Sequence, residues 1–314
     1  MDDLGFAPDY DRPIPYMQRT RDYYRALGYD TPYRWAQFAR VPFQPLRTPL
    51  SECCVALITT AAPFQPGKGD QGPGAPYNGG AKFHAVYSGE VDETHDLRIS
   101  HVAYDRAHTT AADSATYFPL TQFKACASRG RVGRVARRFH GAPTRRSQRT
   151  TMGVDAPEIL ARCRADGADG AVLVPNCPVC HQTLALVARH LEESGIATVI
   201  MGCAKDIVEH CGVPRLLFSD FPLGNGAGRP GDAGSQAFTL ELALRVLEAA
   251  PAARTTVQSP LRWSDDASWK LDYGSTRGLT PVELERRRAE FDAQKRMALN
   301  QEQPARAAGY PDTR

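Results

Sequence analysis

Short apolar runs alternate with amphipathic segments through most of the chain. Buried strands are predicted by apolar, β-branched runs at residues 53–62, 170–174, 196–201 and 215–219. Further strands are predicted at 97–104, where apolar and polar residues alternate, and at 132–139. Helices are predicted at 119–128, 157–165, 177–193, 204–210 and 235–249. Strands that alternate with helices indicate an α/β fold, a three-layer, Rossmann-like or flavodoxin-like structure with a mostly parallel sheet.

The two ends of the chain lack this alternation of strands and helices. Eleven of the 24 prolines precede Tyr77, so a helix at 15–27 should lead into an extended arm that wraps the body. Residues 281–300 predict one long charged helix, exposed or facing a partner. We therefore expect an N-terminal arm (1–50), an α/β domain that carries the chemistry (51–250) and a C-terminal extension (251–314).

Composition narrows the classes of protein. Of 314 residues, 42% are hydrophobic and 23% are charged, which is typical of a folded globular chain. No apolar run reaches the roughly 18 residues that a membrane-spanning helix needs, and the acidic start lacks the apolar core of a secretory signal. We therefore expect a cytoplasmic protein. The net charge of +3 gives no reason to expect nucleic acid as a partner.

One segment is strongly basic. Residues 114–154 contain no Asp or Glu, and nine Lys or Arg residues fall between Lys124 and Arg149. Such a segment could face phosphate, a carboxylate substrate or an acidic partner. The simpler interpretation is a solvated basic surface loop. Residues 142–152 in particular read as loop.

The most informative segment is VLVPNCPVCH, residues 172–181. A buried strand ends at Val174, a turn follows, and two thiols stand three residues apart at the start of a helix. Ligands of parallel α/β folds bind at the carboxyl ends of strands, which is where this motif lies. We expect Asn176 to cap the helix and Pro178 to occupy an early helical position.

This position favours reactive thiols. Cys177 would lie in the first helical turn, where unpaired backbone N–H groups and the helix dipole stabilise a thiolate. The spacing of three places Cys180 on the same helical face, within reach of a disulfide. We therefore expect Cys177 to attack, Cys180 to resolve and His181 to transfer a proton.

Three other interpretations of the motif stay open. CPVCH matches the attachment signature of c-type haem, although a signal peptide and a clear distal ligand are missing. A structural zinc site would need two more ligands, for which Cys203, His210 and Cys211 are available. The two cysteines could also be inert buried thiols, as we expect Cys53 and Cys54 to be.

Other candidates lie outside the motif. His101, with Asp105 or Asp113, could bind a cation, orient a carboxylate substrate or act as an acid–base pair. The alternative is a hydrogen-bonded core histidine and loop-capping aspartates. Thr59 and Thr60 end the first strand and could line a substrate pocket. The glycine-rich loop at 224–228 fits no nucleotide motif, and we expect a flexible loop near the site.

Four stretches of the chain resemble a known family. They are residues 15–46, VALITTAAP (55–63), residues 96–120, and DGAVLVPNCPVCHQTLALVARHLEESGIATV (169–199). They resemble the B-component selenoproteins of glycine, sarcosine, betaine and D-proline reductases and their selenium-free relatives, with the D-proline reductase branch closest. The fourth stretch is the most specific, because the family places its selenocysteine-x-x-Cys pair at this strand–turn–helix.

The resemblance implies an oxidoreductase of amino-acid metabolism. Cys177 matches the selenocysteine and Cys180 matches its partner. In the family, the selenol attacks a carbon, a C–N bond breaks reductively, and a thioredoxin-like dithiol resets the oxidised pair. Relatives that cleave proline or betaine use a pyruvoyl group from a separate subunit. This chain has no selenocysteine, and it shows no pyruvoyl-forming segment, so a partner subunit or another activation route is implied.

We therefore expect reductive cleavage of a carbon–heteroatom bond, C–N above all, in a small amino-acid-like substrate, ending in a Cys177–Cys180 disulfide. We assign no metal ion or cofactor to the chain itself and expect an oligomer or heteromer. Two alternatives from other classes are a thiol–disulfide redox or sensor protein and a metal-bound or inert structural subunit.

Overall fold

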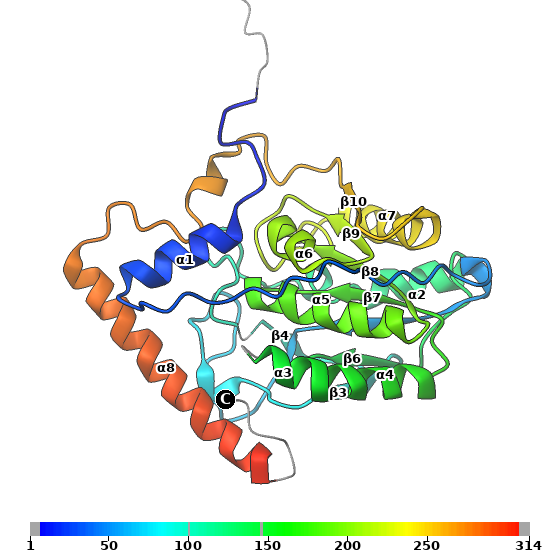
Figure 1. Cartoon of the computed structure of the whole chain (residues 1–314), viewed down its shortest axis with the longest axis horizontal. Coiled ribbons are helices and arrows are strands. Elements are labelled where there is room, and N and C mark those ends of the chain that lie inside the picture. Colours follow the sequence, from blue (N-terminus) through cyan, green and yellow to red (C-terminus); the bar gives the residue numbers. More distant parts are fainter. Residues whose placement is uncertain (1–6, 100, 145–146, 308–314) are drawn as a thin grey trace, which may run out of the picture.

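A mostly parallel sheet forms the centre of the molecule (Figure 1). The computed structural model describes residues 7–99, 101–144 and 147–307, with side chains to residue 300. Within these ranges the sheet has eight strands in the order β10-β9-β8-β7-β1-β6-β3, with β5 also paired to β1. The strands are β1 (Cys54–Thr59), β3 (Tyr87–Glu90), β5 (Arg134–Val135), β6 (Arg138–Gly141), β7 (Gly170–Val174), β8 (Ala197–Gly202), β9 (Arg215–Phe218) and β10 (Thr255–Gln258). Only β3 runs antiparallel to its neighbour in this sheet.

Helices cover both faces of the sheet, which confirms the predicted three-layer α/β fold. Alternate residues of β1 point to opposite faces, as strand geometry requires. Val55 and Leu57 pack with α2 (Leu120–Ser128) and α7 (Ala233–Ala249). Ala56 and Ile58 pack on the other face with α4 (Ala156–Ala165), α5 (Pro178–Glu193) and α6 (Lys205–Cys211).

The chain ends pack against this body and against each other. Helix α1 (Tyr16–Ala26) bonds to α6, where the Met17 N–H donates to Asp206 Oδ2 at 2.8 Å. Helix α8 (Pro281–Ala307) passes the C-terminal end of α1 (Figure 1), where the Tyr24 and Phe291 rings lie 5.3 Å apart. The predicted wrapping arm and long C-terminal helix are thus present, while the division at residues 50 and 250 stays a prediction. None of the helices in the described ranges is long and apolar enough to cross a membrane.

Several local predictions were wrong. Of the strand expected at 97–104, only β4 (Leu97–Arg98) forms, antiparallel to β2 (Ala62–Pro63). The following residues turn away, and the Asp105 N–H bonds to the Leu223 carbonyl at 3.1 Å instead of to a strand. The loop expected at 142–152 contains α3 (Gln148–Thr150), which continues as a π-helical turn (Thr151–Asp155) into α4. Strand β10 was missed, because three of the four residues in its sequence TTVQ are polar and it lies at the sheet edge.

A buried ion pair fastens the N-terminal arm to the sheet. Arg215 Nη1 lies 2.7 Å from Glu192 Oε1, and both side chains are almost fully buried. The arm joins this pair, because Arg215 Nη2 donates to the Gln44 carbonyl at 2.8 Å and the Gln44 N–H donates to Glu192 Oε2. Burial raises the pKa of Glu192 and lowers that of Arg215. Removing either charge would therefore destabilise the fold, because the other would stay buried without a counter-charge.

We predict that Glu192→Gln lowers the free energy of unfolding by about 3–5 kcal/mol, because Arg215 loses its buried counter-charge. Glu193→Gln, at the exposed neighbouring position, should change it by less than about 0.5 kcal/mol. Urea denaturation followed by circular dichroism measures both. Equal midpoints for the two variants would contradict the assigned role of the pair.

Candidate functional site

The motif residues lie at the carboxyl end of β7, where α5 begins. Cys177 caps this helix, since its backbone is extended and its Sγ accepts the Cys180 N–H at 3.2 Å. The prediction that Asn176 caps the helix was therefore wrong by one residue. Pro178 explains the difference, because its fixed φ and missing N–H suit the first helical position and leave residue 177 as the cap. Asn176 is instead fully buried, and its N–H donates to Thr60 Oγ1 at 3.1 Å.

His101, distant in sequence, converges here with the two thiols of the motif. One ligand atom each from His101, Cys177 and Cys180 lie within 4.8 Å of one another. Thr144 Oγ1 lies 3.3 Å from Cys180 Sγ and adds a fourth polar group. Cys177 is 3% exposed and Cys180 is fully buried. All eight cysteines, these two included, are free thiols, and the chain brings the predicted pair together as neighbours.

Burial and hydrogen bonding divide the charge between the two thiols. Burial raises the pKa of Cys177 well above its ordinary value, and the adjacent Cys180 sulfur raises it further. For Cys180, burial acts in the same sense, but the Cys177 side chain, the positive charge of His101 in its protonated form and the Thr144 hydroxyl outweigh it and lower the pKa well below the usual range. The lowered pKa of Cys180 favours a thiolate on that sulfur over one on Cys177. The expectation that the helix start makes Cys177 the attacking thiol stays a prediction.

His101 is held by the end of β1. Its Nε2 lies 2.7 Å from the Thr60 carbonyl oxygen, which can only accept, so Nε2 carries the ring proton. In the neutral ring, the lone pair is then on Nδ1. Thr60 thus orients both His101, through its carbonyl, and Asn176, through its hydroxyl. Thr59 serves the fold instead, since its hydroxyl donates to the Tyr117 carbonyl at 3.2 Å.

His181 lies beneath the thiols with both ring nitrogens bonded to backbone. Nδ1 donates to the Cys177 carbonyl at 2.7 Å, and Nε2 accepts the N–H groups of Cys203 and Ala204 at 2.9 and 3.1 Å. Complete burial lowers its pKa to about 4, so the ring is neutral near pH 7. Transfer of a proton by His181 would require one of these bonds to break. The proton-transfer role stays a prediction, while the contacts show a side chain that positions the helix start.

The two predicted aspartates have other partners. Asp105 is buried and lies 3.0 Å from His108 Nδ1, and burial raises its pKa. Asp113 caps a short helical turn through the Ala115 N–H at 3.0 Å and accepts the Gly231 N–H at 2.8 Å. Both aspartates thus make the contacts that the loop-capping alternative predicts. His101 lies beside the two thiols.

Sequence reasoning missed three residues of the site. Arg106 donates to the His101 carbonyl at 2.8 Å, and its guanidinium interacts electrostatically with Cys177. Tyr273 is partly buried, interacts electrostatically with both thiols and donates to the Ala103 carbonyl at 3.0 Å. Thr144 is the third. Arg106 lies in a stretch that carries the family resemblance, which was an available signal, whereas Tyr273 lies in a segment without any pattern.

An open pocket of about 600 Å³ adjoins this site through Arg106. Its other lining residues include His108, Thr109 and Asp113. The thiols themselves do not line it. The glycine-rich loop expected to be flexible is instead packed inside the protein, because residues 221–228 are buried and a Cβ at Gly226 would lie 2.8 Å from the Met201 carbonyl.

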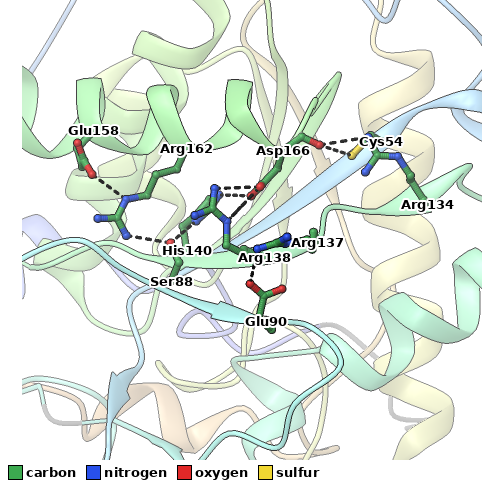
Figure 2. A network of polar contacts seen from close by, with 10 residues as sticks. All are labelled: Cys54, Ser88, Glu90, Arg134, Arg137, Arg138, His140, Glu158, Arg162 and Asp166. Atoms are coloured by element: carbon green, nitrogen blue, oxygen red, sulfur yellow. Dashed lines mark hydrogen bonds and ion pairs between the residues drawn. The ribbon is translucent and has the colours of Figure 1, made fainter.

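The basic segment is largely neutralised within the molecule. Figure 2 shows Arg138 paired with Asp166 at 2.9 Å and Arg137 paired with Glu90 at 2.9 Å. Arg131 pairs with Glu241 at 3.0 Å. These contacts favour a structural role over a site for phosphate or an acidic partner. Arg145 and Arg146 lie outside the described residues.

Comparison with known proteins gives one relationship that bears on this site. The chain is 27% identical over 223 residues to D-proline reductase subunit gamma of Acetoanaerobium sticklandii, covering 70% of this chain and 88% of that protein. No protein-family model matches the chain, and no solved structure matches it. The predicted resemblance is confirmed as a distant relationship to the D-proline reductase branch.

The buried imidazole predicts a pH-dependent stability. An unfolded histidine takes up a proton near pH 6.5, whereas folded His181 does so only near pH 4. The unfolded state therefore binds more protons in this window, and stability should fall as the pH drops from about 6.5 towards 4, by up to roughly 3 kcal/mol for such a group.

Urea denaturation at several pH values measures this effect. The variant His181→Gln, which cannot take up this proton, should show a shallower decline than the parent, although its stability at pH 7 should be lower. His210→Asn, on the adjacent helix, serves as the control and should keep the parent slope. Parallel pH profiles for the parent and His181→Gln would refute the assignment.

Proposed function

We propose that this chain is the thiol-bearing subunit of a reductase that cleaves a C–N bond in a small amino-acid-like substrate. The observation that carries the proposal is the convergence of Cys177, Cys180 and His101 at a helix start. A supporting finding is the distant relationship to a D-proline reductase subunit. The reductase class rests on that relationship, and the chemistry below is inferred from the site.

The first step makes Cys177 the nucleophile. The Cys180 thiolate accepts the Cys177 proton, and the Cys177 sulfur attacks the carbon that bears the substrate nitrogen. A C–S bond forms, the C–N bond breaks, and the departing amine takes up one proton from solvent. In this scheme the lowered pKa keeps the Cys180 sulfur ionised, so that it can act as the base that deprotonates Cys177.

The second step closes the disulfide. His101 Nδ1 accepts the Cys180 proton, and the Cys180 sulfur attacks Cys177 Sγ. An S–S bond forms, the C–S bond breaks, and the substrate carbon takes the electron pair and a proton. The two thiols have then lost two electrons, and the C–N bond has become one C–H and one N–H bond. A thioredoxin-like dithiol returns the pair to the reduced state.

The residues around the thiols fit the separate roles proposed for Cys177 and Cys180. Arg106 places a positive charge beside Cys177 and also lines the open pocket, so it offers an anchor for a substrate carboxylate on the approach to the thiols. Because both thiols are covered, the substrate and the reductant reach them only when a covering segment moves. Tyr273, a partly buried side chain from the C-terminal segment, is the one whose displacement we propose.

We also propose a partner subunit. The relative is named as a subunit, and the family resemblance implies a pyruvoyl group on a separate chain. Such a group would supply an electron-withdrawing carbonyl that activates the substrate nitrogen. The open pocket offers a place where a group from another subunit can approach Arg106. The steps assigned to this chain use only its own thiols and His101.

The test uses the complex recovered from native cells through an affinity tag on this chain. The reduced complex is incubated with D-proline, sarcosine, betaine or glycine, and the cysteines are mapped by differential alkylation and mass spectrometry. We expect one of these substrates to yield one cleaved amine product for each Cys177–Cys180 disulfide. A disulfide that forms equally without any amine would instead support the redox or sensor alternative.

Variants separate the two thiols. Cys177→Ser should lower turnover about 10³-fold or more and bind no substrate covalently. Cys180→Ser removes both the base for Cys177 and the resolving sulfur, so it should lower turnover as strongly. At alkaline pH, where Cys177 ionises without that base, a substrate adduct should accumulate on Cys177. Cys211→Ser, a buried core thiol outside the site, is the matched control and should keep the parent turnover. Full turnover in either site variant would refute the mechanism.

A further inference from the structure

We infer that His101, Cys177 and Cys180 in the reduced protein form a three-ligand binding site for a zinc ion. The inference concerns the same side chains as the proposed function but does not depend on C–N cleavage. It rests on the donor atoms, their spacing and the groups that hold them in place.

The donor set and spacing suit zinc. Two cysteine sulfurs and one imidazole nitrogen are ligands that Zn²⁺ prefers. With Zn–S bonds of about 2.3 Å and Zn–N bonds of about 2.1 Å, tetrahedral ligand atoms lie roughly 3.5–3.8 Å apart. The three donor atoms already lie within 4.8 Å of one another. Side-chain shifts of about 1 Å would therefore bring them to ligand distances.

The outer contacts are those expected around a metal ligand. A zinc-bound histidine commonly donates its second ring N–H to a backbone carbonyl, which fixes the tautomer and leaves the other nitrogen for the ion. His101 has this arrangement, because Nε2 donates to the Thr60 carbonyl and the Nδ1 lone pair remains. The Cys180 N–H and the Thr144 hydroxyl lie at the two sulfurs and orient them in the same way.

Charge balance in a dry site also favours the ion. Two thiolates and one divalent cation have zero net charge, whereas a lone thiolate in a buried pair leaves an uncompensated negative charge. Three protein ligands leave one position for solvent or another small ligand, which is typical of an exchangeable zinc rather than a closed structural centre. The binding residues differ from the set considered earlier. Cys211 packs in the core, and the Cys203 N–H bonds to His181.

Zinc binding and disulfide formation exclude each other, since both use the same two sulfurs. An ion at this site would hold the pair reduced, protect it from oxidation and block Cys177 as a nucleophile. The thiol pair would then be controlled by metal as well as by reductant.

The test measures zinc on the full-length chain, reduced and freed of metal with a chelator. Zn²⁺ is titrated against a chromophoric chelator, and Co²⁺ is used as a spectroscopic probe. We expect one ion per chain and a sulfur-to-cobalt charge-transfer band. Cys177→Ser, Cys180→Ser and His101→Gln should each weaken binding by at least about 10–100-fold. Cys211→Ser and His210→Asn should bind as the parent does.

A second measurement needs no substitution. The parent chain oxidised to the Cys177–Cys180 disulfide should lose the ion, and reduction should restore binding. Failure of the reduced parent to bind Zn²⁺ above the level of the oxidised form would overturn the inference. So would parent-like binding by the three ligand variants. Substrate-dependent disulfide formation without zinc binding would leave the proposed function intact, and zinc binding without turnover would leave only this inference.

Discussion

The site depends on the cost of burying an ionised thiol pair. Two sulfurs three residues apart lie at the start of α5, and almost no water reaches them. A charge there persists only where donors surround it, so the surrounding chain must supply them. The Cys180 N–H, the Thr144 hydroxyl and His101 do so from three separate segments. The reactive pair is thus a product of the whole fold and not of the motif alone.

The same constraint explains how the strands and loops meet at this end of the sheet. β1 ends at Thr59, and the next residue fixes both His101 and the turn before Cys177. His181 joins the start of α5 to the turn that follows β8. These bonds are short and mostly to backbone, which makes the position of the thiols insensitive to surface changes. The Glu192–Arg215 pair fixes the far end of α5 in a comparable way.

Part of this structure could be predicted because its signals are local. The alternation of apolar runs and amphipathic helices follows from periods of 2 and 3.6, and it predicted the layers and most helix bounds. The thiol pair followed from a strand–turn–helix that is continuous in sequence. Cap assignment failed by one residue at Asn176, where the geometry of Pro178 outweighed the ordinary preference for an Asn cap.

Other parts depend on long-range contacts that no local pattern records. His101 was named from its residue type, but its approach to the thiols depends on residues 101–109 turning over the end of β1 instead of extending as a strand. Thr144 and Tyr273 come from segments with no chemical signature, and Arg106 looked like one basic residue among many. The lowered pKa of Cys180 arises from His101, Thr144 and the Cys177 side chain, whereas the helix start alone favours Cys177.

The most direct measurement is an NMR pH titration of the reduced chain with [13Cβ]cysteine, assigned with Cys177→Ser and Cys180→Ser. The account predicts that the pair holds one thiolate at about pH 7, favoured on Cys180, while burial raises the pKa values of Cys54, Cys126, Cys163, Cys203 and Cys211. Eight cysteines that all stay protonated to about pH 8.5 would contradict the central claim that this fold builds an ionised thiol pair.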